Sequence, residues 1–318
     1  MDDILKDATA GDPMTGLKWT RKTPAKISRA LKRKRFKAGR TTVRRLMRER
    51  KYALRVNRKR LTKQQDPNRD RQMRYISRVR RAFIKVGRPA ISVDTKKKEL
   101  VGPFRNPGRT WRQKPVEVLD TDFLSDAVGK AIPYGIYDPQ HYSGYLMVGT
   151  SHETAQFAVA AIRAWWIEVG RSQYVGQDHL LIEADGGGAN SSSSWLWKYE
   201  LQLLADEFGL TITVTHYPPG ASKWNPIEHR MFSLITQNWA GQPLVDYKTL
   251  LNFARTAGKH SGFHCKAHLD TTEYETRLKV TKEQKAQIKL SRRRVFPKWN
   301  YTIEPHKSPD KNRQVISG

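Results

Sequence analysis

The stretch that decides the fold is LTITVTHYPPGASKWNPIEHRMF, residues 210–232. Its first part, LTITVT, alternates apolar residues with threonines, which predicts a strand with one apolar face, and the two prolines that follow end it. A loop then leads into a helix start. Asn225 can cap that helix, Pro226 suits its first position, and Glu228 stands where a capping-box glutamate belongs. Glu228 is therefore either only a cap or a catalytic carboxylate held beside the end of a strand.

Charge is the strongest signal in the composition. The chain has 318 residues, 38% of them hydrophobic, which is enough for a sizeable core and compatible with two domains. Lys and Arg number 59 against 30 Asp and Glu, a net charge of +29. Residues 1–90 hold 30 of the basic and 7 of the acidic residues, leaving 29 against 23 for the rest. A basic N-terminal third predicts a polyanionic partner, which could be a nucleic acid or an anionic membrane surface.

Several protein classes are excluded. No apolar run approaches the length of a membrane span, and no N-terminal stretch resembles a signal peptide. Cys265 is the single cysteine, which excludes an internal disulfide and a multi-cysteine zinc site. We therefore expect a soluble protein of a reducing, intracellular compartment.

The basic third has an organisation of its own. Residues 1–20 are expected to form a loose N-terminus, 21–62 a helix-turn-helix DNA-binding domain, and 63–88 a linker helix. Two amphipathic helices separated by Gly39 are typical of a helix-turn-helix. The second helix carries the predicted DNA contacts Arg40, Thr41, Thr42, Arg44, Arg45 and Arg48. A solvated basic hairpin, or an arm that meets DNA without a defined groove geometry, is the alternative.

Residues 89–318 change to strand-like runs. Strands come first in succession and then alternate with helices, which predicts an α/β domain with a mixed sheet flanked by helices on both faces.

Three carboxylates meet at one edge of this sheet if the strand of Asp94 lies next to that of Asp185 and the helix of Glu228 folds back over the same edge. Asp94 and Asp185 each close a predicted strand, and Glu228 follows the next one. Three converging carboxylates repel one another unless a hard cation neutralises them, so we expect Mg²⁺, with Mn²⁺ as an alternative. Two such ions can activate a nucleophile on one side of a phosphodiester and stabilise the leaving oxygen on the other. Each acid taken alone could be a turn or capping residue. The rival acids are Asp122, Asp126 and Asp138, with Asp138 the best substitute.

Basic residues near these acids are predicted phosphate contacts: Lys96, Lys97, Lys98, Lys223 and Arg230. Three consecutive lysines in a hairpin are often only solvated, however. Trp224 can stack on DNA or pack the loop onto the sheet, and packing is favoured.

Two further motifs are set aside. Gly186–Gly188 lack the Lys-Ser/Thr of a phosphate-binding loop, so a flexible loop beside the active site is expected. His260, His264 and His268 recur at helical spacing around Cys265, as zinc ligands would. The alternation of buried types through Phe263–Leu269 favours a strand instead.

Three segments together resemble a family. SVDTKKKELVG, LLIEADGGGAN and HYPPGASKWNPIEHRMF are similar to the three acidic motifs of DDE transposases from bacterial insertion sequences, in the Rhodopirellula-type branch related to the mariner-like superfamily. The resemblance runs from about Trp19 to WNYTIEP near the C-terminus. It implies an RNase H-like fold for residues 89–318, with a C-terminal extension, and Asp94, Asp185 and Glu228 as ligands of two metal ions.

The resemblance also implies a function. We expect binding of terminal inverted repeats, metal-dependent hydrolysis and strand transfer, a homodimer or larger assembly on DNA, and a place in the bacterial cytoplasm with the nucleoid. Two alternatives stay open at this point: a non-catalytic DNA-binding regulator derived from a transposase, and a nuclease without strand transfer.

Overall fold

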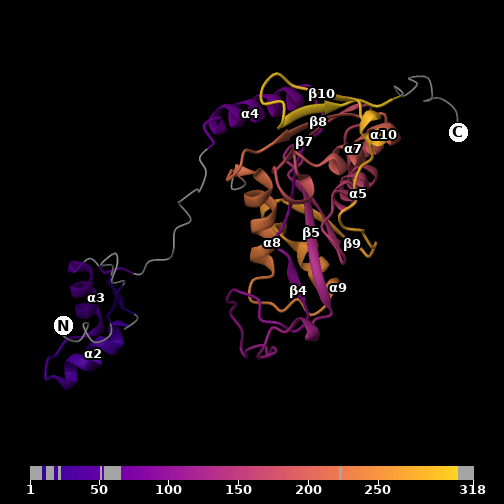
Figure 1. The fold of residues 1–318 in the computed structure, drawn as a ribbon. Helices are drawn as coiled ribbons and strands as arrows, with labels where there is room; N and C mark the ends of the chain where they lie inside the picture. The colour runs from indigo at the N-terminus through magenta and orange to yellow at the C-terminus, as the bar shows by residue number, and fades with distance from the viewer. Residues whose placement is uncertain are drawn as a thin grey trace. The chain divides into compact units, whose positions relative to one another are not determined.

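The computed structural model describes residues 9–11, 18–20, 23–50, 52–53, 66–221 and 224–306. The chain divides into two compact units, residues 1–61 and 62–318. Figure 1 draws both as ribbons.

The first unit contains a helix pair. Strands β1 (Thr9–Gly11) and β2 (Lys18–Thr20) pair antiparallel, and α2 (Pro24–Arg33) and α3 (Arg40–Glu49) follow. Thr23 caps α2 because its side chain accepts a hydrogen bond from the Lys26 N–H (3.3 Å). The two helices share a small buried cluster of Ile27, Leu31 and Val43. The apolar pattern thus predicts the helix pair correctly, while its docking as a helix-turn-helix in a DNA groove stays a prediction.

The second unit is built on a mixed sheet. Among the described residues this sheet has nine strands, in the order β10-β11-β8-β7-β3-β5-β6-β9, with β4 beside β5. Strands β3, β7 and β8 run parallel, and β5 lies antiparallel to both β3 and β6. The central order β6-β5-β3-β7-β8 with these directions is that of the RNase H-like fold, so the predicted fold class is confirmed. The strands are β3 (Ala90–Thr95), β4 (Glu99–Val101), β5 (Gly129–Asp138), β6 (Ser143–Gly149), β7 (His179–Ala184), β8 (Thr211–His216), β9 (His264–Asp270), β10 (Leu290–Arg292) and β11 (Asn300–Ile303).

Helices cover both faces of the sheet (Figure 1). One core contains α5 (Ala155–Trp165) and α7 (Trp195–Phe208), and the other contains η5 (Glu228–Phe232), α8 (Ser233–Asn238) and α9 (Tyr247–Thr256). Strand β6 shows the alternation: Tyr145 and Met147 belong to the first core, Leu146 and Val148 to the second. Because both faces are buried, the central strands read as nearly continuous apolar runs.

The remaining helical segments are short, apart from α4, which has 17 residues. They are α4 (Arg69–Lys85), η1 (Leu124–Asp126), the π-helical η2 (Trp166–Gly170), α6 (Arg171–Gln173), η3 (Gly188–Asn190), η6 (Lys259–Ser261) and α10 (Lys282–Ala286). Local chemistry sets the ends of α7: the Ser194 side chain accepts from the Trp197 N–H (3.2 Å), and Gly209 adopts a left-handed φ of 66°.

Helix α4 is fixed to the sheet by buried polar groups. The Gln72 and Asn300 side-chain amides exchange two hydrogen bonds of 2.8 Å, and the Gln72 amide also donates to the His216 carbonyl (2.9 Å). One turn before the helix ends, Arg80 forms a two-pronged ion pair with the buried Glu183 and donates to the Tyr217 hydroxyl (2.9 Å). Such contacts depend on direction, so they determine the rotation of α4 as well as its position.

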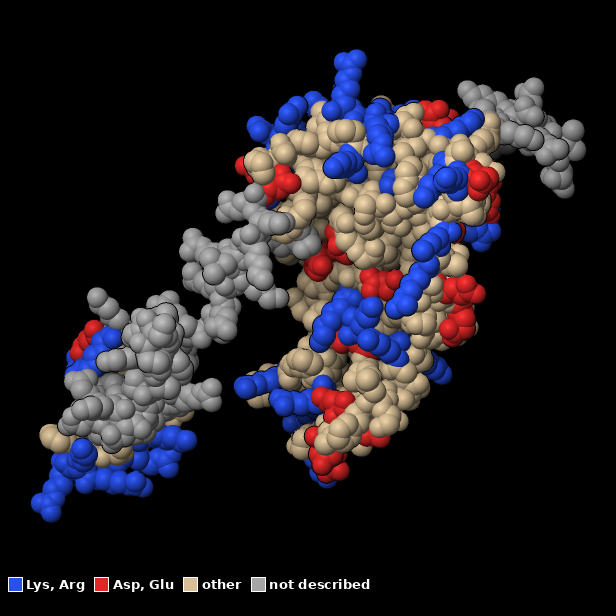
Figure 2. All heavy atoms as spheres, in the orientation of Figure 1, with Lys and Arg blue, Asp and Glu red and all other residues tan. Residues whose placement is uncertain are grey.

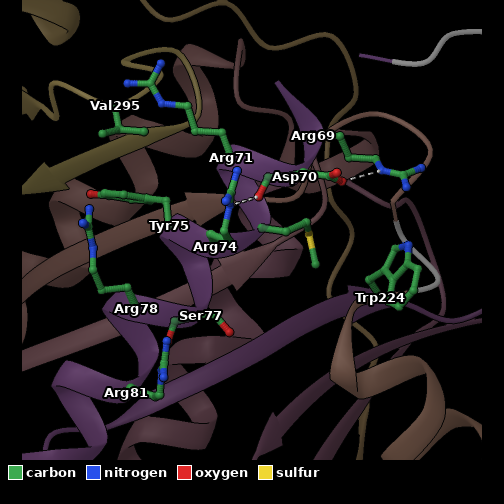
Figure 3. Close-up of a pocket in the computed structure, with 11 residues that line it drawn as sticks. Arg69, Asp70, Arg71, Arg74, Tyr75, Ser77, Arg78, Arg81, Trp224 and Val295 are labelled. Carbon is green, nitrogen blue, oxygen red and sulfur yellow. Dashed lines mark hydrogen bonds and ion pairs between the residues drawn. The ribbon is translucent and has the colours of Figure 1, made fainter. Parts of the chain in front are cut away.

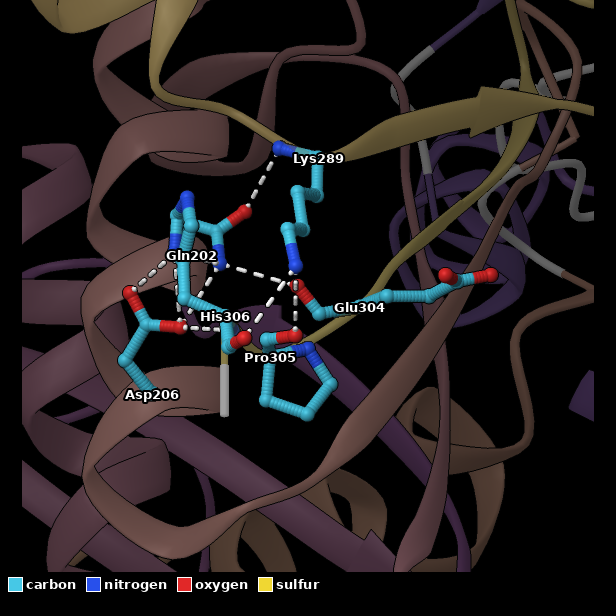
Figure 4. Close-up of polar contacts among 6 residues, drawn as sticks. All are labelled: Gln202, Asp206, Lys289, Glu304, Pro305 and His306. Atoms are coloured by element: carbon cyan, nitrogen blue, oxygen red, sulfur yellow. Dashed lines mark hydrogen bonds and ion pairs between the residues drawn. The ribbon is translucent and has the colours of Figure 1, made fainter. Parts of the chain in front are cut away.

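The segment after β11 is tied to α7 (Figure 4). Gln202 donates to the Glu304 carbonyl (2.9 Å) and accepts from the Lys289 N–H (2.8 Å). Asp206 accepts from the His306 N–H (2.8 Å) and pairs with its ring (2.9 Å). These bonds hold β10 and β11 against the helix that covers one face of the sheet.

Candidate active site

The site begins at the adjacent ends of β3 and β7. In the parallel register Val93 lies opposite Ala184, so the next residues, Asp94 and Asp185, come side by side where the strands end. Asp94 is only 7% exposed, and its carboxylate accepts a hydrogen bond from the Thr95 N–H (2.8 Å). The sheet topology therefore brings together two acids that are far apart in the sequence.

Glu228 joins them from the second core. It is the first residue of η5, a π-helical turn that continues into α8. This turn packs close to the sheet at Gly135, the residue of β5 that pairs with Asp94. A Cβ atom at Gly135 would stand 2.5 Å from a Phe232 ring carbon and 2.9 Å from the Ile227 side chain. A residue without a side chain is needed here for η5 to approach Asp94.

Asn225 has a different role from the one expected. The Glu228 N–H at the helix start donates to the Asn225 backbone carbonyl (3.2 Å), while the buried side chain of Asn225 faces β3: the side-chain oxygen accepts from the Ser92 hydroxyl, and the amide donates to the Val93 carbonyl and the Asp94 carboxylate (both 3.4 Å). The capping interpretation of this side chain is thus wrong. Asn225 instead links the start of the Glu228 helix to β3 and to Asp94.

The three carboxyl groups lie within electrostatic range of one another. Burial, followed by the charges of Asp185 and Glu228, raises the pKa of Asp94 to about 8. Burial also raises the pKa of Asp185, with Glu153 and Glu228 adding to the effect. Burial raises the pKa of Glu228, and the positive charges of His229 and Lys96 offset only part of this rise. Burial and the neighbouring acids therefore favour the protonated form of Asp94 when no cation is bound.

The donor set fits a hard divalent cation, although the ligand geometry is not preformed. In the part of the chain that the structure describes, no three His, Cys, Asp or Glu side chains form a ready metal-binding group. Carboxylate oxygens are nevertheless the donors that Mg²⁺ takes, and a cation would offset the burial of these groups and the repulsion that Asp94 receives from Asp185 and Glu228. Asp94, Asp185 and Glu228 are the residues that would hold it.

A buried hydrogen-bond chain fixes the backbone at Asp185. Burial lowers the pKa of His216 to about 4, so its imidazole is neutral at pH 7. Its Nδ1 contacts the Asp185 carbonyl (2.9 Å), which can only accept, so Nδ1 carries the proton. Its Nε2 then accepts from the Tyr301 hydroxyl (3.1 Å), which in turn accepts from Trp197 Nε1 (2.9 Å).

A fourth carboxylate, Glu153, lies beside Asp185 and was missed from the sequence. It precedes α5, adds to the raised pKa of Asp185, and pairs with Lys98 (2.8 Å). A Cβ atom at Gly188 would stand 3.0 Å from its carboxylate, so Glu153 reaches the glycine loop after Asp185. The sequence does place Glu153 four residues after the apolar strand GYLMVG, in the segment TSHET that follows it.

The predicted phosphate contacts differ in environment. Lys96 is buried, pairs with Glu99 (2.6 Å) and lies 4.4 Å from the centre of the Trp239 ring. Burial lowers its pKa. Lys97 and Arg230 are exposed, Lys98 is paired with Glu153, and Lys223 lies outside the described residues. A cavity of about 540 Å³ between Lys97 and Glu228 leaves room for a ligand next to the carboxylates.

The predicted DNA contacts of the first unit are all exposed. Helix α3 begins at Arg40, after Gly39, and presents Thr41, Thr42, Arg44, Arg45 and Arg48 to solvent. Arg45 pairs loosely with Glu49 (3.8 Å).

The rival interpretations gain no support. Asp138 lies three residues beyond Gly135 on β5, toward the start of β3, where it accepts from the Tyr174 hydroxyl (2.7 Å) and pairs with His141 (2.8 Å). Asp122 and Asp126 are exposed outside the sheet strands. Trp224 is 52% exposed, so packing, the role favoured from the sequence, covers less than half of it.

The segment around Cys265 forms a strand, as the alternation of buried residue types predicts, and not a helix that would align its histidines as zinc ligands. Residues 264–270 form strand β9, with Cys265 and Ala267 buried. His268 pairs with Glu168 (3.0 Å) and stacks on Tyr145. The strand interpretation is confirmed.

The comparison with known families agrees with this geometry. A family model described as the Rhodopirellula transposase DDE domain matches residues 1–305. The chain belongs to this family. The match covers both units, and with them all three acidic segments of this DDE transposase domain.

Solved structures similar to this DDE transposase include complexes of Mos1 transposase. They are a pre-cleavage Mos1 transpososome (14% identity, TM-score 0.45), a Mos1 paired-end complex with the left transposon end (14%, 0.43) and a Mos1 strand transfer complex (16%, 0.40). Each match covers 73% of this chain and 64 to 65% of the Mos1 chain. No curated protein matches the chain. In the described residues, no helix has both the length and the apolar character needed to cross a membrane.

Proposed function

We propose that this DDE transposase binds the terminal inverted repeats of its element through residues 21–62 and performs hydrolysis and strand transfer at Asp94, Asp185 and Glu228. The proposal is supported by the neighbouring positions of Asp94 and Asp185 at the ends of β3 and β7, and by the electrostatic coupling of Asp94 to Asp185 and Glu228, which together with burial raises its pKa to about 8. Separate roles for residues 1–20, 63–88 and 89–318, as terminus, linker and catalytic domain, belong to the same proposal.

The residues around the site have distinct tasks in this proposal. Two divalent ions, Mg²⁺ or Mn²⁺, would supply activation of a water or 3′-hydroxyl and stabilisation of the leaving oxygen. Asp94, Asp185 and Glu228 hold the cations, and Asn225 orients Asp94 through its amide. Lys97 and Arg230, both exposed, supply positive charge for the phosphates near the scissile bond, together with Lys96, Lys98 and Lys223.

Assembly and location follow from the reaction. Transposition joins two ends of one element, so at least two copies of the chain are expected on double-stranded DNA, in the cytoplasm where the nucleoid lies. Sedimentation with and without end DNA measures this, and a monomer on paired ends would contradict it.

The proposal is tested by Asp185→Asn with Asp126→Asn as the matched control. Both changes remove one carboxylate, but Asp126 is exposed and outside the sheet. With Mg²⁺ and a labelled duplex carrying the element's inverted repeat, we expect Asp185→Asn to abolish cleavage while end binding is kept, and Asp126→Asn to cleave normally. Cleavage at the wild-type rate by Asp185→Asn would refute the assignment.

Two other outcomes identify the alternatives. A wild-type chain that binds ends but never nicks DNA at any Mg²⁺ or Mn²⁺ concentration is a DNA-binding regulator. A chain that yields hydrolysis products but no joined product in a plasmid integration assay is a nuclease.

A further inference from the structure

Helix α4 carries a row of arginines on the side away from the sheet. Arg71, Arg74, Arg78 and Arg81 follow one another at spacings of three, four and three residues, which places them on one face of the helix. All four are exposed, whereas Gln72 and Ile76 between them are buried. We call these four residues the α4 arginine face. Figure 2 shows Lys and Arg side chains gathered over this part of the molecule.

The α4 arginine face has no acidic partner in the described part of the chain. Arg71 lies over the Phe296 ring (5.3 Å) and Arg78 over the Tyr75 ring (5.4 Å). Arg74 and Arg81 donate only to backbone carbonyls one turn earlier (both 3.3 Å). Contacts of this kind hold a guanidinium in place but leave most of its N–H donors unused, in contrast to Arg80, which Glu183 neutralises.

These side chains line a groove that reaches toward the candidate active site. Its volume is about 860 Å³, and Val295 of the β10–β11 hairpin and Trp224 form other parts of its wall (Figure 3). Trp224 lies on the loop four residues before Glu228 and is more than half exposed. A chain of phosphates lying on the α4 arginine face would therefore pass close to the loop that leads into the catalytic helix.

The dimensions of the face suit a DNA backbone. Ten residues of helix separate Arg71 from Arg81, which is roughly 15 Å at about 1.5 Å per residue. One strand of B-form DNA presents a phosphate about every 3.4 Å along the helix axis, so roughly four phosphates fit that length. Arginine, with its planar fork of donors, is well suited to each of them.

We propose that the α4 arginine face binds the phosphate backbone of DNA beside the cleavage site, as a contact separate from the α3 arginines. This inference rests on the proposed function for the identity of the DNA, since the element end is the duplex that must reach Glu228. The fixed rotation of α4 on the sheet, imposed by Gln72 and Arg80, keeps the face at a constant place relative to the site.

The test measures the salt dependence of DNA binding by the full chain. All four arginines are changed to Gln, and binding to a mixed-sequence duplex of about 30 base pairs is followed by fluorescence anisotropy between about 50 and 300 mM salt. EDTA is present throughout, so that no cleavage occurs. Each phosphate contact adds about 0.9 to the slope of log K against log salt, so the slope should fall by about 3 to 4.

Two control variants separate a specific contact of α4 with DNA from a general effect of net charge. The charge-matched control changes four exposed basic residues outside α4 to Gln: Arg171, Lys248, Lys259 and Lys279. Its slope should change by less than about 1. Changing the four arginines of α4 to Lys keeps the charge and should keep most of the slope. An equal fall in both Gln variants would mean that only net charge matters, and would overturn the proposal.

The result separates this proposal from the proposed function. If the wild-type chain cleaves element ends but the slope of the α4 Gln variant is unchanged, the face is not a DNA contact and the function stands. If the slope falls as expected but no cleavage occurs with Mg²⁺ in the wild type, the DNA contact stands and the proposed chemistry fails. Binding of anionic vesicles that depends on the same arginines, without any effect on DNA binding, would also overturn the proposal.

Discussion

Removing the most buried carboxylate of the candidate site should stabilise the metal-free protein. The pKa of Asp94 is about 8 in the folded chain, because of burial and of repulsion from Asp185 and Glu228. An unfolded aspartate titrates near about 3.9. At pH 7 the folded state therefore keeps a proton that the unfolded state has lost. The interval from the unfolded pKa to pH 7 is about three pH units, each worth about 1.36 kcal/mol, so keeping this proton lowers the free energy of unfolding by at most about 4 kcal/mol. The Asp94→Asn variant has no such proton and avoids this loss of stability.

The sign of the pH dependence distinguishes this cause from a packing effect. Between the two pKa values the folded state binds more protons, so the free energy of unfolding of the wild type falls as pH rises. The asparagine variant lacks this dependence and can still accept from the Thr95 N–H. Its advantage should grow from about 1.5 kcal/mol at pH 5 to about 4 kcal/mol at pH 7.

Urea unfolding in EDTA, followed by tryptophan fluorescence at several pH values, measures the difference. Asp126→Asn, an exposed site, is the control and should leave stability unchanged. Millimolar Mg²⁺ should stabilise the wild type and have less effect on Asp94→Asn, because a cation binds the ionised cluster. The reasoning fails if Asp94→Asn is less stable than the wild type at pH 7, or if its advantage is the same at every pH.

Two further substitutions test how the sheet supports the site. Arg80→Ala leaves the buried Glu183 without its guanidinium and should lower the free energy of unfolding by about 3 kcal/mol. Arg80→Ala combined with Glu183→Gln should recover part of this loss in urea unfolding, and a double variant no more stable than the single one would contradict it. Gly135→Ala places a methyl group against Phe232 and Ile227 and should cost about 1 to 3 kcal/mol by displacing η5. It should also slow cleavage without weakening end binding, and an unchanged cleavage rate would show that η5 tolerates the shift.

The sequence predicts those strands and strand ends that depend on a local pattern of apolar and polar residues. Alternation and strand-end position correctly gave β7, β8 and β9, and put Asp94 and Asp185 at strand ends. The pairing of β3 with β7 could be stated only as a condition, because no local signal determines which strands are neighbours.

What the sequence could not reveal depends on contacts between distant residues. The cap pattern at Asn225 was misleading because its partner, Ser92, lies 133 residues earlier. The burial of Lys96 arises from the Trp239 ring, which the lysine run itself does not suggest. No pattern around His216 in the sequence indicates that its ring bonds to the Asp185 carbonyl, 31 residues earlier in the chain.

The paired amides of Gln72 and Asn300 have a consequence for how the protein is made. The two residues are 228 positions apart, so Gln72 leaves the ribosome long before its partner is synthesised. A chain that stops before β11 lacks this amide, as well as the Tyr301 hydroxyl that supports His216 and, through it, Asp185. Helix α4 therefore gains its amide partner, and the Asp185 backbone its support, only after the chain has been translated through β11.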